Sequence, residues 1–401
     1  MKKIPFYFLF VFIFYTAHSQ PTKKTMKKLP DTGQNSSYTN TFGEDNDYRI
    51  NEPSFVKNSN GTTTDLITEL MWQSTDGGEM TIENAIQYCD TLNLGGFSDW
   101  RLPNCHELFS ILNHDKTNPA IDTNYFTKTN ADYWWSIQRQ KTDSNKIWVT
   151  NVGGGVGNKP KSETLSAGGN KRYHVRAVRD IHTPNTLPLH FIDKHDGTIK
   201  DTITELMWTA TLSADTITWE DALTLAENSN FAQHSDWRLP NIKELQSLNN
   251  ESFISPSLDT NFFKITGNKQ IWSSTTLPNK FNDAWYLDTR FGITTYAEKS
   301  TRRLYSLLVR TDTAVNTPSP FEPDFEININ PNPANNQINV SLSNNANIAN
   351  LIISIFDIDG KLTLTSNSTS IDVSSIPAGI YIVKINADNK IATKKILIHH
   401  P

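Results

Sequence analysis

The stretch Asp65-Leu-Ile-Thr-Glu-Leu-Met-Trp72 decides the fold, because it recurs almost unchanged 136 positions further on as Asp201-Thr-Ile-Thr-Glu-Leu-Met-Trp208. A second stretch, Ser98-Asp-Trp-Arg-Leu-Pro-Asn104, recurs at nearly the same spacing as Ser235-Asp-Trp-Arg-Leu-Pro-Asn241. Shorter matches lie between and after them in the same order. Two long copies of one unit indicate tandem domains and not a solenoid of short repeats.

The remaining parts of the chain differ from these copies in composition. Met1-Lys2-Lys3 precedes an apolar run that ends in small residues, which predicts a secretory signal peptide cleaved after Ser19. The polar stretch that follows predicts a flexible lead-in, and the prolines beyond Thr313 predict a semi-rigid linker. The expected order is signal peptide 1–19, lead-in 20–50, first repeat domain 51–180, second repeat domain 187–312, linker 313–325 and C-terminal domain 326–401.

Composition excludes several classes of function. The 401 residues include 37 Lys and Arg against 42 Asp and Glu, and a net charge of -5 argues against a nucleic-acid partner. Beyond the leader, no stretch is apolar enough to cross a membrane, so we expect no integral membrane segment in the mature chain. Two cysteines exclude a disulfide-dense scaffold and a four-cysteine zinc site. We expect no metal ion and no cofactor.

The periodicity of each copy predicts two helices among short strands. Apolar residues recur at helical spacing after a capping Thr81, and a shorter helix follows each Trp-Arg-Leu-Pro turn. The expected helices are 81–92, 106–112, 218–226 and 242–248. The sequence therefore predicts an α+β class: two tandem compact α+β domains, followed by a small Ig-like antiparallel β-sandwich.

The most specific local motif is the Asp-Trp-Arg-Leu-Pro turn. In the structural interpretation, Trp and Leu enter the core while Asp and Arg pair or satisfy buried backbone groups. In the functional interpretation, the Asp is a catalytic or metal-binding carboxylate, but no second acid or His lies at a useful spacing. We favour the structural role for the six residues Asp99, Trp100, Arg101, Asp236, Trp237 and Arg238.

The two cysteines are replaced together in the second copy, where Ala226 and Ile242 stand in their places. Paired loss is typical of a disulfide, so we predict a Cys89–Cys105 bridge. A catalytic Cys105 beside His106 is the alternative, although adjacent helix positions point in different directions.

Positive charge concentrates in one segment of the first copy. It follows Gly153-Gly-Gly-Val-Gly157, which we expect to be a flexible surface turn, and the second copy mostly lacks it. Such a patch can hold an anionic ligand through charge and backbone N–H groups, and the alternative is a solvated loop without a ligand. Trp134 also has no counterpart in the second copy. The candidate ligand-binding residues are Lys159, Lys161, Lys171, Arg172, Arg176 and Trp134. No catalytic motif occurs in the sequence, so we predict no catalytic residues and no enzyme.

The tail contains short alternating strands around Asn-Pro-Asn-Pro333, Asp-Gly-Lys361 and Gly379-Ile-Tyr-Ile-Val-Lys-Ile385. This order resembles the type A C-terminal sorting domain of the type IX (Por) secretion system. The resemblance implies that the secretion machinery is a partner and that the protein is secreted or displayed on the outer cell surface. The motif residues are Asn332, Pro333, Gly360, Gly379, Tyr381, Lys394 and Lys395.

The repeats, read through their shared D-x-x-T-x-L-M-W, S-D-W-R-L-P-N-x-x-E-L, D-T-N-[Y/F]-F and V-R segments, resemble the Lcl C-terminal domain family. The resemblance implies a compact domain related to C-type-lectin-like folds, and an adhesin-like role. In the collagen-like adhesin that gives the family its name, the domain binds sulfated glycosaminoglycans. We therefore expect a non-enzymatic carbohydrate binder, with extracellular glycans or a host surface as partner. The alternatives are a structural surface component and, third, an enzyme on a lectin-like fold.

Overall fold

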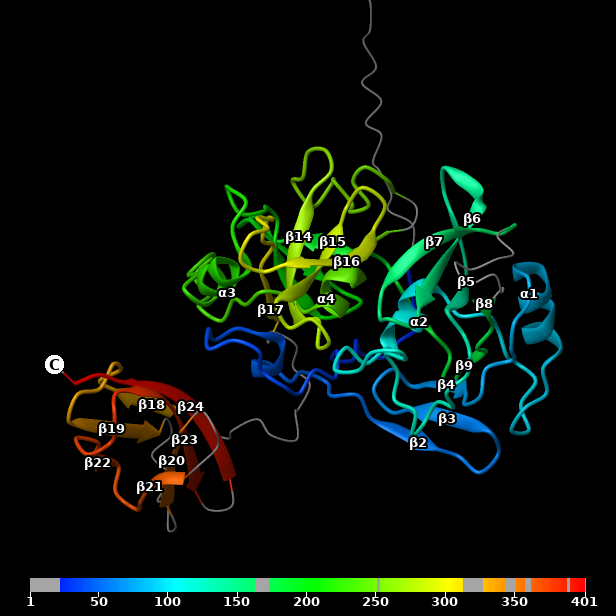
Figure 1. Cartoon of the computed structure of the whole chain (residues 1–401). Coiled ribbons are helices and arrows are strands. Elements are labelled where there is room, and N and C mark those ends of the chain that lie inside the picture. The colour runs from blue at the N-terminus through cyan, green and yellow to red at the C-terminus, as the bar shows by residue number, and fades with distance from the viewer. Residues whose placement is uncertain are drawn as a thin grey trace, which may run out of the picture. The chain divides into compact units, whose positions relative to one another are not determined.

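The computed structural model describes residues 22–162, 173–250, 253–312, 327–342, 351–357, 362–387 and 390–400. The chain divides after Asp312 into two compact units, which are described separately (Figure 1). Strands make up 38% and helices 10% of the structure. The predicted α+β class is therefore wrong, and the chain is mostly β. The reason is that the predicted helices are only short pieces of six to ten residues, while the segments between them pair as hairpins.

The first repeat consists of two four-stranded sheets and two helices. The first sheet has the order β2 (Phe55–Lys57), β3 (Thr62–Asp65), β4 (Leu70–Gln73) and β9 (Val178–Asp180), all antiparallel. The second has the order β7 (Val156–Pro160), β6 (Asp143–Asn151), β5 (Tyr133–Gln140) and β8 (Tyr173–His174), in which β8 pairs in parallel. The helices are α1 (Ile82–Thr91) and α2 (Cys105–Ser110).

The second repeat has a similar arrangement, but its second sheet has three strands instead of four. Its sheets are β11 (Phe191–Asp193), β12 (Thr198–Asp201), β13 (Leu206–Thr209) and β17 (Val309–Thr311), and β14 (Gln270–Thr276), β15 (Asp283–Asp288) and β16 (Ile293–Glu298). The helices are α3 (Trp219–Glu227) and α4 (Ile242–Ser247). All four helices thus lie where the periodicity predicts them.

Local capping explains where the helices begin. Thr81 and Thr218 accept a hydrogen bond from the third residue of α1 and α3. At α2 and α4, Asn104 and Asn241 form complete capping boxes with a glutamate three positions later. Since that Asn ends the Trp-Arg-Leu-Pro turn, the repeated motif is a helix-start signal.

The duplicated tryptophans form the core. The eight Trp residues that occur in both copies are at most 3% exposed. Large rings at equivalent positions explain why both copies keep the same chain path. These residues are Trp72, Trp100, Trp135, Trp148, Trp208, Trp237, Trp272 and Trp285.

The two repeats share one hydrophobic cluster, because Ile242, Leu277 and Trp285 of the second repeat pack with residues of the first. Strand β7 contacts β16 and helix α2 contacts α4, so equivalent elements meet across the junction (Figure 1). The glycine cluster lies at this junction and not at a surface turn. A Cβ on Gly154 or Gly155 would lie 3.5 Å from the Trp285 ring, which shows how closely the backbone approaches it.

The N-terminal segment, defined here as residues 22–51, is packed against both repeats and is not the flexible lead-in that its composition predicts. Strand β1 (Thr22–Lys24) pairs with β10 (Asn185–Leu187), which joins the repeats. A 3₁₀ turn follows at Asp45–Asp47. Polar residues of the segment are buried because they find partners elsewhere: Thr275 donates to Asp45 at 2.5 Å.

The C-terminal unit is a β-sandwich with a core of Ile and Val. One sheet has the order β18 (Ile327–Asn330), β19 (Gln337–Leu342) and β22 (Ser370–Asp372). The other has the order β21 (Leu362–Ser366), β20 (Leu351–Asp357), β23 (Gly379–Ala387) and β24 (Lys390–Ile398), and all pairs are antiparallel. Residues of both sheets share one cluster. The predicted leader and linker lie outside the described residues.

Acidification should weaken the junction between the repeats through His114. Its ring packs against Trp285 and hydrogen-bonds the Gly154 carbonyl at 2.9 Å, and burial lowers its pKa from 6.5 to about 3. The stability that this neutral ring contributes is complete above pH 6.5 and is lost as the pH falls towards 3. We expect the melting temperature to fall between pH 7 and pH 5, and to fall less in His114→Gln. The exposed His195→Gln is the control, and an undiminished pH dependence in His114→Gln would contradict the assignment.

Candidate functional site

The Asp-Trp-Arg-Leu-Pro arginines form the best-organised ion pairs of each repeat. Arg101 makes two hydrogen bonds of 2.8 Å with Glu107 and a further one of 2.8 Å with Asp180. Arg238 makes two with Glu244, at 2.6 and 2.5 Å. The same glutamate closes the capping box of the following helix. The arginine therefore ties the helix start to the rest of its repeat.

The aspartate of the motif faces a second arginine. Asp99 accepts hydrogen bonds of 2.7 and 3.0 Å from Arg179, and Asp236 accepts hydrogen bonds of 2.8 and 3.1 Å from Arg310. Both arginines come from the Val-Arg segment that ends each repeat. These contacts agree with the structural interpretation. Among the described residues, no group of three His, Cys, Asp or Glu side chains could hold a metal ion.

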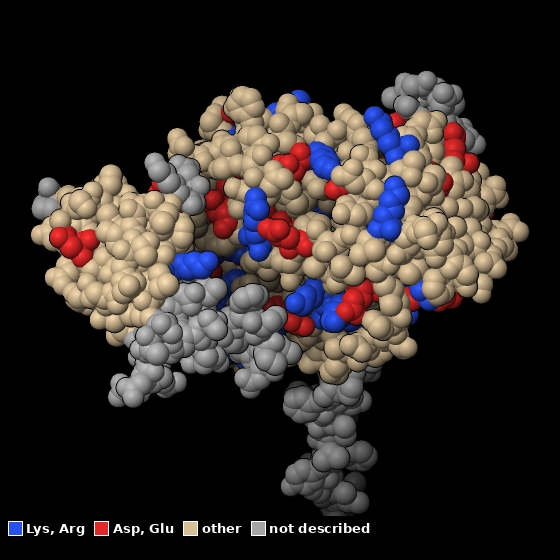
Figure 2. Space-filling view, turned by 90° about the horizontal axis from the view of Figure 1, so that it is seen from below, with Lys and Arg blue, Asp and Glu red and all other residues tan. Residues whose placement is uncertain are grey.

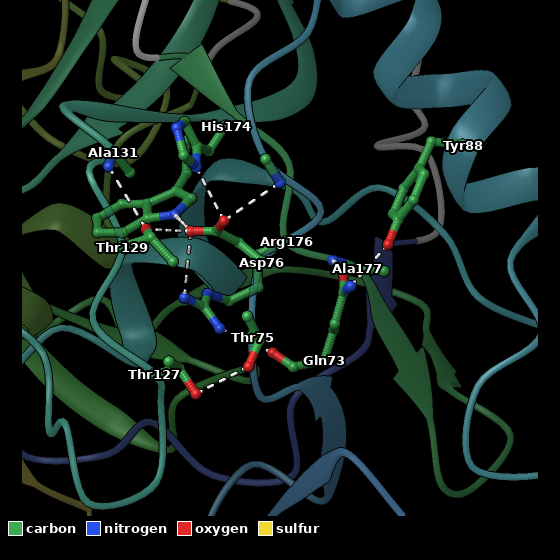
Figure 3. A network of polar contacts seen from close by, with 12 residues as sticks. Gln73, Thr75, Asp76, Tyr88, Thr127, Thr129, Ala131, His174, Arg176 and Ala177 are labelled. Carbon is green, nitrogen blue, oxygen red and sulfur yellow. Dashed lines mark hydrogen bonds and ion pairs between the residues drawn. The ribbon is translucent and has the colours of Figure 1, made fainter.

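A buried polar network distinguishes the first repeat, and Figure 3 shows it from close by. Asp76 lies at its centre and accepts hydrogen bonds from Thr129 at 2.6 Å and from Trp134 at 3.1 Å, and His174 Nδ1 lies 2.8 Å from it. Arg176 donates to the backbone carbonyls of Gln73 and Ser74 and lies 3.6 Å from the carboxylate.

Electrostatics hold this network in a charged form. Burial alone would raise the pKa of Asp76, but the hydrogen bond with His174 and the charge of Arg176 lower it to about 2. Burial lowers the pKa of Arg176 to about 10, and Asp76 opposes that shift. Both side chains are 1% exposed. The network thus fixes the strand ends around it and does not itself meet solvent.

The second repeat has lost this network as a unit. The two copies can be aligned on their Trp and Val-Arg matches. In this alignment Leu212 replaces Asp76 and Ile271 replaces Trp134, while Tyr305 replaces His174 and Leu307 replaces Arg176. Joint replacement by residues without charge is expected, since removing one member alone would leave a buried charge unpaired.

The predicted ligand-binding patch is only partly a surface feature. Trp134 and Arg176 belong to the buried network, so they are not part of an exposed patch. Lys159 lies on β7 with its ammonium 5.0 Å from the Tyr133 ring centroid, and Lys161 lies 3.9 Å from Glu83. Lys171 and Arg172 lie outside the described residues.

The second repeat holds a basic pocket that the sequence analysis missed. The cavity of about 470 Å³ is lined by three cationic side chains, one carboxylate, amides and the Tyr305 ring. Lys269 lies 4.9 Å from the centroid of that ring. The signal was available, because Arg302-Arg303 occupies the positions of Lys171-Arg172 when the chain is counted back from Val309-Arg310. The charged lining residues are Lys269, Arg290, Arg303 and Asp288.

Charge elsewhere on the surface is mixed in sign. On the face in Figure 2, basic and acidic side chains are interspersed among uncharged residues. The counts agree, with 12 basic against 14 acidic residues in 61–180 and 11 against 15 in 195–312. Attraction for an anion therefore depends on local pockets and not on a field over the whole surface.

The predicted disulfide is not present: Cys89 and Cys105, which both lie in the described part of the chain, are thiols and are fully buried. They pack in two different hydrophobic clusters, which explains why no bond joins them. Burial raises the pKa of Cys89 to about 12. A thiol with a raised pKa is a poor nucleophile.

The motif residues of the tail have structural roles in the C-terminal unit. Asn332 accepts a hydrogen bond of 2.8 Å from the Leu397 backbone, and Tyr381 donates one of 2.9 Å to the Pro377 carbonyl. The remaining motif residues lie near these contacts or outside the described residues. Pro333 precedes β19, Gly379 begins β23, Lys394 and Lys395 lie on β24, and Gly360 is not described.

These features define a protein built from two copies of one domain and a separate β-sandwich tail. Residues 61–179 and 197–310 match the Lcl C-terminal domain family, and residues 328–399 match the secretion system C-terminal sorting domain. Because the first match covers more than half of the chain, the protein belongs to the Lcl C-terminal domain family. No curated protein shows significant similarity.

The sorting domain determines where the protein goes. It indicates export by type IX secretion to the cell surface or the extracellular space, and makes that machinery a partner. No helix in the described residues is long and apolar enough to span a membrane.

Replacing the arginine of the Asp-Trp-Arg-Leu-Pro motif should lower the free energy of unfolding more in the second repeat than in the first. Arg238 and Glu244 are 4% and 6% exposed, whereas Arg101 is 31% exposed and solvent screens its charge. We expect Arg238→Ala to cost about 3–5 kcal/mol, as for a buried pair that loses one partner. Arg101→Ala should cost less in the same denaturant titration. Equal losses would show that burial does not set the strength of these pairs.

The thiols should resist modification until the protein unfolds. We expect Ellman's reagent to detect neither cysteine in the native secreted protein and both in denaturant without reductant. Mass spectrometry of unreduced peptides would test the same point independently. Recovery of a Cys89–Cys105 cross-linked peptide would restore the disulfide prediction.

Proposed function

We propose that the protein is a non-enzymatic, adhesin-like carbohydrate binder that acts at the cell surface after type IX export. The observation that carries the proposal is the basic pocket of the second repeat. Its lining combines guanidinium and ammonium groups, amides and an aromatic ring. This combination suits a sugar with acidic substituents, because amides bind hydroxyl groups and cations bind sulfate or carboxylate.

The geometry favours recognition of a local anionic group over a long polyanion. Three cations face the cavity with one carboxylate, while the repeat as a whole is acidic. The Gln270 amide donates to Asp288 at 3.0 Å and accepts from Arg302 at 2.6 Å, which fixes the carboxylate at one side of the pocket. A glycosaminoglycan is therefore bound through one acidic unit, and salt weakens the binding only moderately.

A glycan array with the mature chain, residues 20–401, tests the proposal. We expect saturable binding to acidic glycans and at least a tenfold loss of affinity in Arg303→Ala, since a charge-assisted hydrogen bond contributes about 1.5–3 kcal/mol. Lys264→Ala, an exposed cation of the same repeat outside the pocket, is the matched control.

The possible outcomes separate the functions considered. Binding that Arg303→Ala and Lys264→Ala affect equally would remove the pocket from the proposal. No binding on a comprehensive array would favour a structural surface component, and turnover of a bound glycan would favour an enzyme.

A further inference from the structure

Helices α2 and α4 are equivalent elements of the two repeats and contact each other, so the two ends of their contact are equivalent in sequence. Near the start of α4, the Lys243 ammonium donates to the Ser110 carbonyl at the end of α2. The equivalent pair at the other end is His106 near the start of α2 and Ser247 at the end of α4, and both line one cavity. The two helices therefore run antiparallel and create two equivalent junctions.

The N-terminal segment fills the first junction. Lys243 donates to the Asp31 carbonyl at 2.7 Å, and the His114 backbone N–H donates to the Thr32 carbonyl at 2.9 Å. Thr275 donates to the Asp45 carboxylate at 2.5 Å. An acidic stretch of main chain thus occupies this junction, with its carbonyl and carboxylate oxygens on donors of both repeats.

The second junction is open. A cavity of about 250 Å³ lies there, between the first repeat, the second repeat and the beginning of the N-terminal segment. Part of its lining is equivalent in sequence to residues around the filled junction: Asn104, His106, Gln138, Ser247 and Asn250 correspond to Asn241, Lys243, Thr275, Ser110 and Asn113.

The equivalence extends to the backbone. Gln138 accepts a hydrogen bond from the Cys105 N–H, just as Thr275 accepts one from the Ile242 N–H. His106, which lines the cavity, occupies the position equivalent to Lys243, whose ammonium donates to the Asp31 carbonyl in the first junction. The framework that holds an acidic segment in one junction is therefore built a second time.

The charge of the open cavity points to the same kind of occupant. Among the residues that the structure describes, its lining contains Lys23, His106 and His190 and no Asp or Glu, although the protein as a whole is acidic. Met26, Leu29 and Ile203 add an apolar wall. A ligand that carries carboxylates and some apolar surface is complementary to such a lining, whereas a cation is not.

We propose that this open junction is a binding site for a short acidic peptide segment of a partner protein. The segment lies in the second junction as residues 31–45 lie in the first, with carbonyl and carboxylate oxygens directed at His106 and the neighbouring amides. The site is distinct from the basic pocket of the second repeat, and the proposal does not depend on carbohydrate binding.

A synthetic peptide with the sequence of residues 30–46 is the probe, because it carries the oxygen pattern that the filled junction accepts. Isothermal titration with the mature chain should give saturable 1:1 binding. A peptide with Asp31→Asn, Glu44→Gln and Asp45→Asn should bind at least tenfold more weakly. Succinate tests whether a carboxylate alone suffices.

Variants of the protein locate the binding. His106→Glu, which places a negative charge in the cavity, and Thr25→Trp, which fills it, should each reduce affinity at least tenfold. His195→Glu, at an exposed site outside the cavity, is the charge-matched control. Circular dichroism spectra and melting temperatures that match those of the unchanged protein would show that these variants are folded, whether or not the protein binds glycans.

Three results would overturn the proposal: no peptide binding at millimolar concentration, equal affinity for the His106→Glu and His195→Glu variants, or succinate binding as tightly as the peptide. The first would show that the cavity does not accept such a segment, the second that the peptide binds elsewhere on the protein, and the third that the cavity takes small carboxylates.

Discussion

An ammonium group lies at the centre of the two-repeat unit, and three parts of the chain close around it. Lys243 is 1% exposed and donates to carbonyls of the N-terminal segment and of the first repeat, each at 2.7 Å. Burial lowers its pKa to about 8, while Asp31, Asp65 and Asp45 oppose the shift. Since a buried charge is tolerated only with its partners in place, the segment and both repeats must assemble together.

This dependence explains why the repeats form one unit although each has a full set of strands and helices. They share a hydrophobic cluster, and glycines 154 and 155 let the backbone approach the second repeat closely. Equivalent elements meet at the junction, yet their side chains have diverged. Lys243 corresponds to His106, and the Asp76 network corresponds to uncharged residues. Duplication supplied the symmetry, and substitution made the two ends of the junction chemically different.

Local signals in the sequence predict what depends on local physics. The duplication, the four helices and the burial of the tryptophans follow from spacing, capping residues and residue size. The same signals do not give the fold class, and the predicted α+β class was wrong. The class depends on the lengths of the helices relative to the hairpins. The burial of Asp31 and Asp45 is also hidden, because a polar segment resembles a flexible one in sequence. Their partners, Lys243 and Thr275, lie far along the chain.

The same reasoning explains the mixed outcome for the candidate site. A basic composition identified the segment that contains Arg176, but the partner that buries this side chain, Asp76, is 100 positions away. The last loop of the second copy is shorter, which shifts the alignment of the two copies in this region. Counting back from Val309 corrects for the shift, so the basic pair Arg302-Arg303 could be found from the sequence.

The C-terminal unit has a hydrophobic core of a different composition from that of the two-repeat unit. Its core consists of Ile, Val, Ala and Tyr residues from 329–398, and no side chain of the two-repeat unit belongs to that cluster. All ten tryptophans lie before residue 286, within the repeats. Neither unit therefore needs the other to complete its core. The described partners of Lys243 and the described linings of the basic pocket and of the open junction all come from the two-repeat unit.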